Sequence, residues 1–439
     1  MLTEAPSILE DLPSRASKAQ GRKRAARSGT FIDNMRLPVH RWFRYSAGFS
    51  AEWVRQVLLD EGMGAGDLVL DPFAGSGTTL VAAQAAGVPS VGYESHPFVQ
   101  RVAEAKLAWA SDIPRFQVFA RDVRTTAEAA MRSSRRAPHE LLRKCYSDDA
   151  LDGLLALRDA YRRLEASAPE PAARLVWLAI TGILRMCSGV GTAQWQYLLP
   201  NKSKARVIAP MPAFDLKIAE MVGDMQHAQA GRSASASVLP HDARARSLPI
   251  EAGSVSLVIT SPPYANNYDY ADATRLEMVF WEEISGWGDL QSVVRRHIVR
   301  SCSQHATADR IELDPLLAQP EVAPIRDELA AVCRQLDEIR HTKGGKKAYH
   351  LMVAAYFADM ALVFNGLRNA CRDGSRVCFV VGDSAPYGVY VPVERWLGDL
   401  AVANGFKSYS FHKLRDRNTK WKNRKHTVPL HEGHLWIEG

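Results

Sequence analysis

Hydrophobic runs of two kinds alternate along the first part of the chain. Residues 66–70 form a short apolar run after a turn, and residues 80–86 are apolar, rich in alanine and closed by Gly87. A second short apolar run, residues 88–92, follows directly. Short apolar runs are typical of buried strands, and a helix-favouring run closed by glycine is typical of a helix. The pattern predicts a strand, a tight turn, a helix and a second strand.

The same patterns predict elements farther along. Helical patterns cover residues 51–60, 151–164, 172–186, 274–281, 349–369 and 391–404, and strand patterns cover residues 257–260, 376–381, 406–411 and 434–437. The helices at 51–60 and 349–369 have an amphipathic pattern, and the last two strands have the character of an antiparallel pair. Alternating strands and helices indicate a parallel sheet with helices on both faces. We predict an α/β fold with a doubly wound, mostly parallel sheet, an antiparallel edge strand and a largely helical insertion.

The third strand of this sheet has two candidates. In a simple doubly wound fold it follows the second strand within a few tens of residues, so the long helical stretch here indicates an insertion. Residues 116–120, followed by Asp122, are one candidate. The other leads to Asp242, from which the pattern continues without interruption to Tyr264. We prefer the second candidate.

Composition limits the class of protein. The chain has 439 residues, 46% of them hydrophobic, which is enough for a substantial core in one large or two ordinary domains. Its net charge of +7 fits a polyanionic partner. The six cysteines lack close pairs, so we expect neither a metal site nor disulfides, and we predict that Cys371 and Cys378 are core thiols. No segment approaches a membrane span, so we expect a soluble protein in a reducing, cytoplasmic setting.

The first predicted turn carries candidate chemistry. Residues 71–79 read Asp-Pro-Phe-Ala-Gly-Ser-Gly-Thr-Thr, and Glu94 follows Asp71 by 23 residues, just past the second strand. Glycines let a backbone approach a ligand closely, and amides at a helix start face a polar or anionic group. An acid at the second strand tip accepts hydrogen bonds from ribose hydroxyls. The pattern predicts a nucleoside-cofactor site, although a glycine turn alone also occurs as ordinary α/β punctuation.

A second motif follows the strand at 257–260. Residues 261–264 read Ser-Pro-Pro-Tyr. Two successive prolines fix the backbone and remove two donors, so nearby carbonyls are free to accept hydrogen bonds from a ligand. Tyr264 adds a flat aromatic face. This loop suits a planar, amino-bearing ring that is stacked and hydrogen-bonded along one edge.

Together, residues 71–79 and 261–264 resemble the cofactor and catalytic motifs of the amino-methylating DNA methyltransferases, which use S-adenosylmethionine. The Ser-Pro-Pro-Tyr form is similar to the branch that methylates the exocyclic N4 amine of cytosine; adenine enzymes more often carry Asp or Asn first. Residues 44–49, 241–258 and 376–384 are similar to further motifs of the family. The resemblance spans residues 44 to about 406, with two long stretches unmatched.

The resemblance implies roles for individual residues. The implied cofactor-binding residues are Tyr45, Ser46, Asp71, Pro72, Phe73, Gly75, Gly77, Thr78, Glu94 and Asp242, and the implied catalytic residues are Ser261, Pro262, Pro263 and Tyr264. Ser46 would hold the methionine carboxylate, Asp71 would lie near the methionine amino group, and Phe73 or Pro97-Phe98 would lie near the adenine. Ser261 and the carbonyl of Pro262 would accept the hydrogens of the target amine. Tyr264 would stack on the flipped base.

The resemblance also implies a division of the chain. Residues 1–30 are expected to form a basic flexible arm, and residues 31–110 with 240–439 the Rossmann-like catalytic methyltransferase domain. Residues 111–239 are the helical insertion and a candidate target-recognition region. Residues 290–347 form a secondary insert within the catalytic domain.

Basic segments supply candidate contacts to double-stranded DNA. Residues 189–204 are polar, aromatic and basic, residues 295–347 have basic ends, and residues 413–425 are the densest basic patch. Solvated surface loops are the alternative for each. The predicted nucleic-acid contacts are Trp195, Lys202, Lys204, Lys346, Lys420, Trp421, Lys422 and Arg424.

The sequence thus predicts a site-specific DNA methyltransferase that acts on N4 of cytosine, in the cytoplasm of a prokaryote. A cognate restriction endonuclease or another defence component is a further expected partner. No Pro-Cys pair occurs, which argues against methylation of the cytosine ring carbon. An adenine or RNA amino-methyltransferase is one alternative. A non-catalytic nucleic-acid-binding protein is another, although its mark would be a broken glycine turn or a lost Pro-Pro loop, and both are intact.

Overall fold

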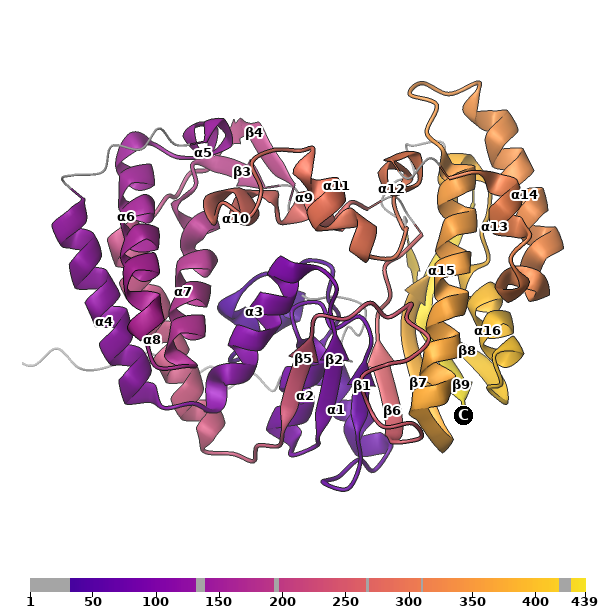
Figure 1. Ribbon diagram of the computed structural model, residues 1–439, viewed down its shortest axis with the longest axis horizontal. Helices are drawn as coiled ribbons and strands as arrows, with labels where there is room; N and C mark the ends of the chain where they lie inside the picture. Colours follow the sequence, from indigo (N-terminus) through magenta and orange to yellow (C-terminus); the bar gives the residue numbers. More distant parts are fainter. Residues whose placement is uncertain (1–31, 132–138, 193–196, 266–267, 309–310, 418–427) are drawn as a thin grey trace, which may run out of the picture.

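The computed structural model describes residues 32–131, 139–192, 197–265, 268–308, 311–417 and 428–439 (Figure 1). The predicted arm at residues 1–30 lies outside the described residues. So do five of the predicted DNA contacts, namely Trp195, Lys420, Trp421, Lys422 and Arg424.

Seven strands form one sheet in the order β5-β2-β1-β6-β7-β9-β8. Their bounds are β1 (Val69–Asp71), β2 (Ser90–Tyr93), β5 (Ala236–Leu239), β6 (Val255–Thr260), β7 (Cys371–Gly382), β8 (Ser408–Arg417) and β9 (Leu430–Glu438). The first five strands in this order pair in parallel, and β9 is antiparallel to both of its neighbours. The mostly parallel α/β fold is confirmed. The antiparallel strand lies one position inside the edge, which β8 forms.

Helices connect and flank these strands (Figure 1). Their bounds are α1 (Ala51–Asp60), α2 (Thr78–Ala86), α3 (Pro97–Leu107), α4 (Ile113–Ala130), α5 (Glu140–Cys145), α6 (Asp148–Leu164), α7 (Ala172–Cys187), α8 (Pro210–Gln229), α9 (Tyr270–Ala273), α10 (Arg275–Phe280), α11 (Asp289–Val293), α12 (Ser303–Ala308), α13 (Leu313–Leu317), α14 (Arg326–Arg340), α15 (Tyr349–Ala370) and α16 (Val393–Ala403). The six helices predicted from periodicity are all present, within a few residues at each end.

The third strand is the one that leads to Asp242. Strand β5 ends at Leu239 and pairs with β2, whereas residues 116–120 lie inside α4. The preferred alternative is therefore confirmed. Strand β5 also falls at the end of the range expected for the helical insertion, so the sheet begins again before residue 240.

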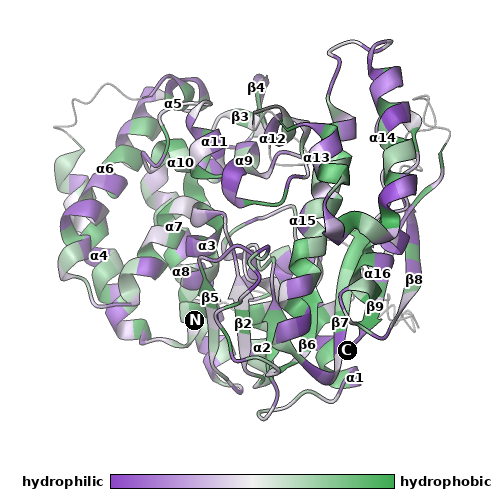
Figure 2. Cartoon of the chain, turned by 45° about the vertical axis from the view of Figure 1, so that its right-hand side comes forward, coloured by the Kyte–Doolittle hydropathy of each residue, from purple (hydrophilic) through white to green (hydrophobic). Residues whose placement is uncertain are grey.

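Alternation along the strands divides the core into two layers. Val69 of β1, Leu257 of β6 and Cys378 of β7 pack with α1 and α2 on one face of the sheet. Leu70 and Val258 pack with α15 and α16 on the other. Because successive side chains of a strand point to opposite faces, strands buried on both faces are almost wholly apolar. Figure 2 shows the central strands largely in the green of hydrophobic residues.

A separate helical lobe lies beside the sheet, at the left of Figure 1. Helices α4, α6, α7 and α8 share one apolar core with α3, which follows the second strand. A two-stranded hairpin, β3 (Val190–Thr192) with β4 (Leu198–Ser203), projects from this lobe and accounts for the polar segment at 189–204. Trp281, just past α10, donates its indole N–H to Thr181 of α7 at 2.9 Å. The segment after the Ser-Pro-Pro-Tyr motif is thereby attached to the lobe.

Helix α15 is buried on nearly all sides, so the amphipathic pattern predicted for it is wrong. It packs between the sheet and helices α12, α13, α14 and α16, which leaves it no polar face (Figure 1). It is the one helix among the described residues that is long and apolar enough to cross a membrane, and 83% of its apolar window is buried inside the protein. Its sequence is that of a core helix. Cys371 and Cys378 are buried free thiols, as predicted.

Gly92 of β2 tests the close packing between the sheet and the first glycine turn. A Cβ at this position would lie 2.8 Å from Cβ of Ala74 and 2.7 Å from a methyl carbon of Leu80. We expect Gly92→Ala to lower the free energy of unfolding by about 1–3 kcal/mol, because the turn and α2 must move away from the strand. Urea unfolding measures the change.

Gly223→Ala in α8 is the matched control, since a Cβ there meets nothing within 4 Å. We expect this variant to be as stable as the parent protein, or more stable by up to about 1 kcal/mol. Equal stability of Gly92→Ala and the parent protein would contradict the packing described here.

Candidate active site

One cavity borders both motifs. It lies beyond the carboxyl ends of β1 and β6, where successive connections of the sheet run in opposite directions, which is the usual ligand position in such sheets. Its lining residues are Tyr45, Ala47, Gly48, Phe49, Phe73, Ala74, Gly75, Ser76, Thr78, Glu94, Ser95, His96, Asp242, Ala243, Ser261, Pro263, Tyr270, Ile298 and Val299. The glycine turn and the Pro-Pro loop therefore meet, although nearly 190 residues separate them in the chain.

A buried hydrogen bond joins the two strand tips that carry the motifs. The Thr260 hydroxyl donates to Oδ1 of Asp71 at 2.6 Å, and the amide of Phe73 donates to the same oxygen at 3.1 Å. Thr79 donates in turn to the carbonyl of Ile259 at 3.1 Å. Burial raises the pKa of Asp71 to about 6. Asp71 joins the two strands and is not among the residues that line the cavity.

The glycine turn approaches the cavity through left-handed backbone. Gly75 has φ +51° and Gly77 has φ +82°, a region that favours glycine. A Cβ on Gly75 would lie 3.3 Å from the ring of Tyr45, and one on Gly77 would lie 3.3 Å from Cβ of Ala103. Gly77 thus packs against α3 behind the wall, whereas Gly75 and Thr78 line the cavity. Pro72 is in the same turn but does not line it.

Glu94, the acid predicted to receive the ribose, lines the cavity just past β2. Its two carboxylate oxygens accept from the amides of Gly75 and His96, each at 2.8 Å. Burial at the cavity wall raises its pKa to about 7, against the effect of these hydrogen bonds. Each carboxylate oxygen has a second lone pair for a ligand hydroxyl. Within the described residues the buried Ser76 hydroxyl of the same wall has no hydrogen-bond partner. These unused groups fit a polar nucleoside.

The segment at the cavity mouth is held by two helices. Asp224 of α8 accepts from the amide of Val39 at 3.1 Å and from the indole N–H of Trp42 at 2.9 Å, and it pairs with Arg41. The buried ammonium of Lys106 on α3 donates to the carbonyl of Phe43 at 3.4 Å. Tyr45 and residues 47–49 then line the cavity, and Ser46 lies between them. The helical lobe therefore supports the cofactor side of the site.

The Ser-Pro-Pro-Tyr loop is fixed from the far side of the sheet. The Ser261 hydroxyl donates to the carbonyl of Val380 on β7 at 3.1 Å, and Ser384 donates to the carbonyl of Ala265. Ser261 and Pro263 line the cavity, Pro262 is buried behind them and Tyr264 is half-buried. Phe73 lines the cavity as well, whereas Phe98, its predicted alternative beside the adenine, is buried in the helical core.

Two residues beside Tyr264 were not predicted. The guanidinium carbon of Arg417 lies 5.2 Å from the centre of the Tyr264 ring. Glu432 acts electrostatically on Tyr264; burial raises the pKa of the Glu432 carboxyl, and Arg415 and Arg417 oppose the rise. Both residues come from the last two strands, so only the pairing of β8 with β9 reveals them. Ile298 and Val299 were also missed, because nothing in their local sequence marks a cavity wall, whereas Tyr270 belongs to the segment 265–270 that was expected to line the base pocket.

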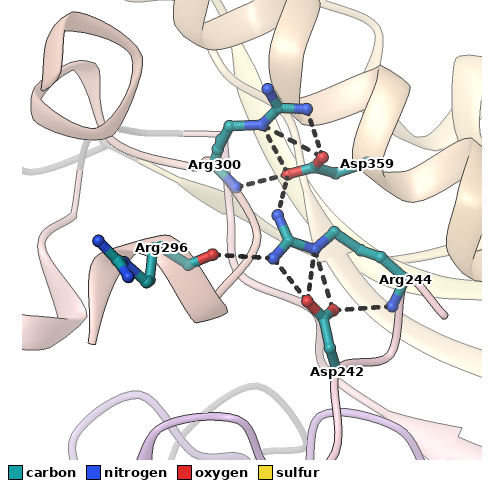
Figure 3. Close-up of polar contacts among 5 residues, drawn as sticks. All are labelled: Asp242, Arg244, Arg296, Arg300 and Asp359. Carbon is teal, nitrogen blue, oxygen red and sulfur yellow. Dashed lines mark hydrogen bonds and ion pairs between the residues drawn. The ribbon is translucent and has the colours of Figure 1, made fainter. Parts of the chain in front are cut away.

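Asp242 borders the cavity but is already paired. Arg244 donates to its carboxylate at 2.6 Å and also contacts Asp359 of α15 at 3.3 Å (Figure 3). Arg300 pairs with the same Asp359 at 2.5 Å, and Arg244 donates to the carbonyl of Arg296 at 3.1 Å. This network fixes the segment that contributes Ile298 and Val299 to the cavity.

A second polar cluster lies at the end of β7. The possible ligand atoms of Asp383, Glu394 and His431 lie within 4.8 Å of one another. Nδ1 of His431 contacts Asp383 at 2.6 Å. Burial, together with the neighbouring carboxyl of Glu394, raises the pKa of Asp383. The spacing of cysteines and histidines in the sequence gave no sign of this cluster.

The described basic residues predicted to contact DNA lie outside this cavity. Lys202 is exposed on β4, and the half-buried Lys204 donates to the carbonyl of Arg185. Lys346 is exposed in the loop before α15 and lines a different hollow. The structure does not bring these three residues together with the two motifs.

The fold and the cavity together define a Rossmann-like methyltransferase. A family model described as DNA methylase matches residues 18–105. The chain is 24% identical over 432 residues to the Type II methyltransferase M.BsoBI of Geobacillus stearothermophilus, a match that covers 88% of this chain and 82% of that protein. It is 25% identical over 403 residues to the Type II methyltransferase M.AvaI of Nostoc sp., covering 86% and 81%. A shorter match, 39% identical over 69 residues, is to the Type II methyltransferase M.MjaII of Methanocaldococcus jannaschii and covers 16% and 13%.

The chain is similar to the amino-methylating DNA methyltransferases, and these matches support a DNA methyltransferase that uses S-adenosylmethionine. Its cofactor is S-adenosylmethionine and its substrate is DNA. The matches do not distinguish the N4-cytosine branch from the N6-adenine branch.

The raised pKa of Glu94 gives cofactor binding a pH dependence. In the predicted role of Glu94, ribose hydroxyls would donate to the ionised carboxylate, so we expect binding to favour the deprotonated form and to strengthen as the pH rises through its pKa of about 7. We expect the Kd of S-adenosylhomocysteine to fall about tenfold between pH 6 and pH 8, since the ionised fraction rises about that much. Isothermal titration calorimetry measures it.

Glu94→Gln is the control for this titration. We expect this variant to bind more weakly and to show no change in Kd over the same pH range. A pH-independent Kd in the parent protein would show that Glu94 does not receive the ribose.

Proposed function

We propose that this protein methylates the exocyclic N4 amine of a cytosine that is flipped out of double-stranded DNA at a specific site. The shared cavity carries the proposal, since Ser261 and Pro263 border the same space as Gly75 and Glu94. A methyl donor held by the glycine turn then faces a ring held by the Pro-Pro loop.

Methylation of an aromatic amine requires hydrogen-bond acceptors beside the amine. The lone pair of an aromatic amine is delocalised into its ring, so the amine is a poor nucleophile until acceptors outside the ring plane draw on its hydrogens. The Ser261 hydroxyl uses its hydrogen in a hydrogen bond to the carbonyl of Val380, so toward the ligand its oxygen can act only as an acceptor. Pro262 and Pro263 have no N–H that would compete. S-adenosylmethionine supplies the electrophilic methyl group when bound, and orientation provides most of the rate.

The aromatic residues around the loop favour an extruded base. Tyr268 lies 4.6 Å from Tyr270 and 5.5 Å from Tyr197, measured between ring centres, and the amide of Tyr264 donates to the hydroxyl of Tyr270 at 3.4 Å. Extrusion of a base costs a few kcal/mol, which stacking and edge contacts in such a pocket offset. We assign Tyr264 as the stacking residue.

Serine as the first residue of the loop favours cytosine over adenine. An N6-adenine or RNA amino-methyltransferase is the second candidate, because the same acceptors suit the amine of adenine. The names of the two long relatives as Type II methyltransferases support a place in restriction and modification, beside an endonuclease, in the cytoplasm. The expected DNA contacts at Lys202, Lys204 and Lys346 belong to this proposal.

Nucleoside analysis of DNA from cells that express the full chain tests the proposal. We expect N4-methylcytosine, and we expect Tyr264→Ala to lower the methylation rate by about ten- to a hundredfold, since one stacked base contributes about 1–3 kcal/mol. The Kd of S-adenosylhomocysteine should not change.

Tyr264→Phe is the control, because it keeps the aromatic face and should keep most of the activity. Detection of N6-methyladenine as the product would show that the target base is adenine and not cytosine. An equal loss of methylation and of cofactor affinity in Tyr264→Ala would show that the base pocket is misplaced.

A further inference from the structure

A second hollow lies between α11, α12 and the loop that joins α14 to α15. Its wall includes Trp287, Arg295, Arg340, Lys346 and Lys347, and none of its lining residues is acidic. Within the described residues neither Lys346 nor Lys347 forms an ion pair with a carboxylate. Of the four cations, Arg295 pairs with Asp269 and Arg340 pairs with Asp337, so Lys346 and Lys347 carry the positive charge that is left for a strongly anionic chain.

Trp287 gives this hollow a stacking surface. The side chain is 43% exposed. The guanidinium carbons of Arg275 and Arg295 lie 5.0 Å and 4.9 Å from its ring centre. These cations hold the exposed ring in one orientation. An aromatic face beside free lysines is the combination with which proteins bind the bases and phosphates of a single strand.

The hollow is connected to the catalytic loop by one ion pair. Arg295 is buried and its guanidinium donates to Asp269 at 2.6 Å. Asp269 accepts from the amides that begin α9, directly after the Ser-Pro-Pro-Tyr segment, and its own amide donates to the Tyr197 hydroxyl at 2.9 Å. The wall of the hollow and the rim of the base pocket are therefore parts of one rigid unit.

The segment from Arg295 to Arg300 separates the two spaces. Arg295 faces the hollow, whereas Ile298 and Val299 line the cofactor cavity. Arg300 anchors the segment on Asp359 (Figure 3). A strand bound in the hollow would thus pass directly beside the cavity that holds the methyl donor.

We propose that this hollow binds the DNA strand next to the flipped base, with Lys346 and Lys347 on its phosphates and Trp287 against an unstacked nucleotide. The inference rests on the proposed transfer to a flipped base in duplex DNA. It assigns to residues 290–347 the role of holding the DNA strand. Recognition of the base sequence is a separate role.

The test is equilibrium binding of the full chain, loaded with S-adenosylhomocysteine, to a fluorescein-labelled duplex that contains the methylated site. We expect Lys346→Ala/Lys347→Ala to weaken binding at least tenfold at 0.1 M NaCl. The slope of log Kd against log salt should fall by about two, because two phosphate contacts are lost. We expect Trp287→Ala to weaken binding about tenfold with an unchanged salt slope.

The control variant removes two positive charges at the amino-terminal ends of the strands, whereas the cofactor cavity lies at their carboxyl ends. Arg372 and Lys407 lie at the amino ends of β7 and β8, and Arg372→Ala/Lys407→Ala should leave both the Kd and the slope nearly unchanged. Thermal unfolding and the Kd of S-adenosylhomocysteine should be the same in every variant, which excludes a folding defect.

Two results would overturn the inference. Unchanged binding by both hollow variants would mean that the strand lies elsewhere, while the proposed function stands. An equal loss in the hollow and control variants would mean that only total charge matters. Failure of the parent protein to bind any duplex would remove the proposed function itself.

Discussion

The site depends on a hydrogen bond of 2.6 Å between the Thr260 hydroxyl and the carboxylate of Asp71. It joins the tips of β1 and β6, which are neighbours in the sheet but almost 190 residues apart in the chain. Both groups are fully buried, so neither has water as an alternative partner, and the loss of either would leave the other unsatisfied. Because the bond fixes two parallel strand ends at one edge, the glycine turn and the Pro-Pro loop face the same cavity.

Buried ion pairs extend this rigidity to the rest of the molecule. Arg185 of α7 pairs with the buried Glu277 of α10 at 2.6 Å, which ties the helical lobe to the segment after the catalytic loop. Two further ion pairs, Arg295 with Asp269 and Arg300 with Asp359, fix the segment 295–300 on the other side of the cavity. A buried charge that loses its partner is costly, so such pairs favour one arrangement of the parts that they join. The cofactor cavity is thus held from three directions.

The sequence was most informative where a pattern is local. Apolar runs and the helix periods predicted the order of strands and helices, and the motifs marked the two strand ends, since the carboxyl ends of parallel strands meet at one edge. Tyr45, Gly75, Glu94 and Ser261, which the structure places around one cavity, were named from these motifs. The sequence could not place Arg417 and Glu432 beside Tyr264, because that contact arises from the pairing of the last two strands. Nor could it show that Asp71 joins two strands, since an acid at the start of a glycine turn has the same sequence pattern whether its side chain faces a ligand or a neighbouring strand.

The central claim is that one cavity places the methyl donor opposite the Ser-Pro-Pro-Tyr loop. A crystal structure of the full chain with S-adenosylhomocysteine tests it most directly. The account predicts that the ribose hydroxyls lie within hydrogen-bond distance of the Glu94 carboxylate and that the sulfur faces Ser261 and Tyr264. A cofactor bound away from Glu94, or one whose sulfur points away from this loop, would contradict it.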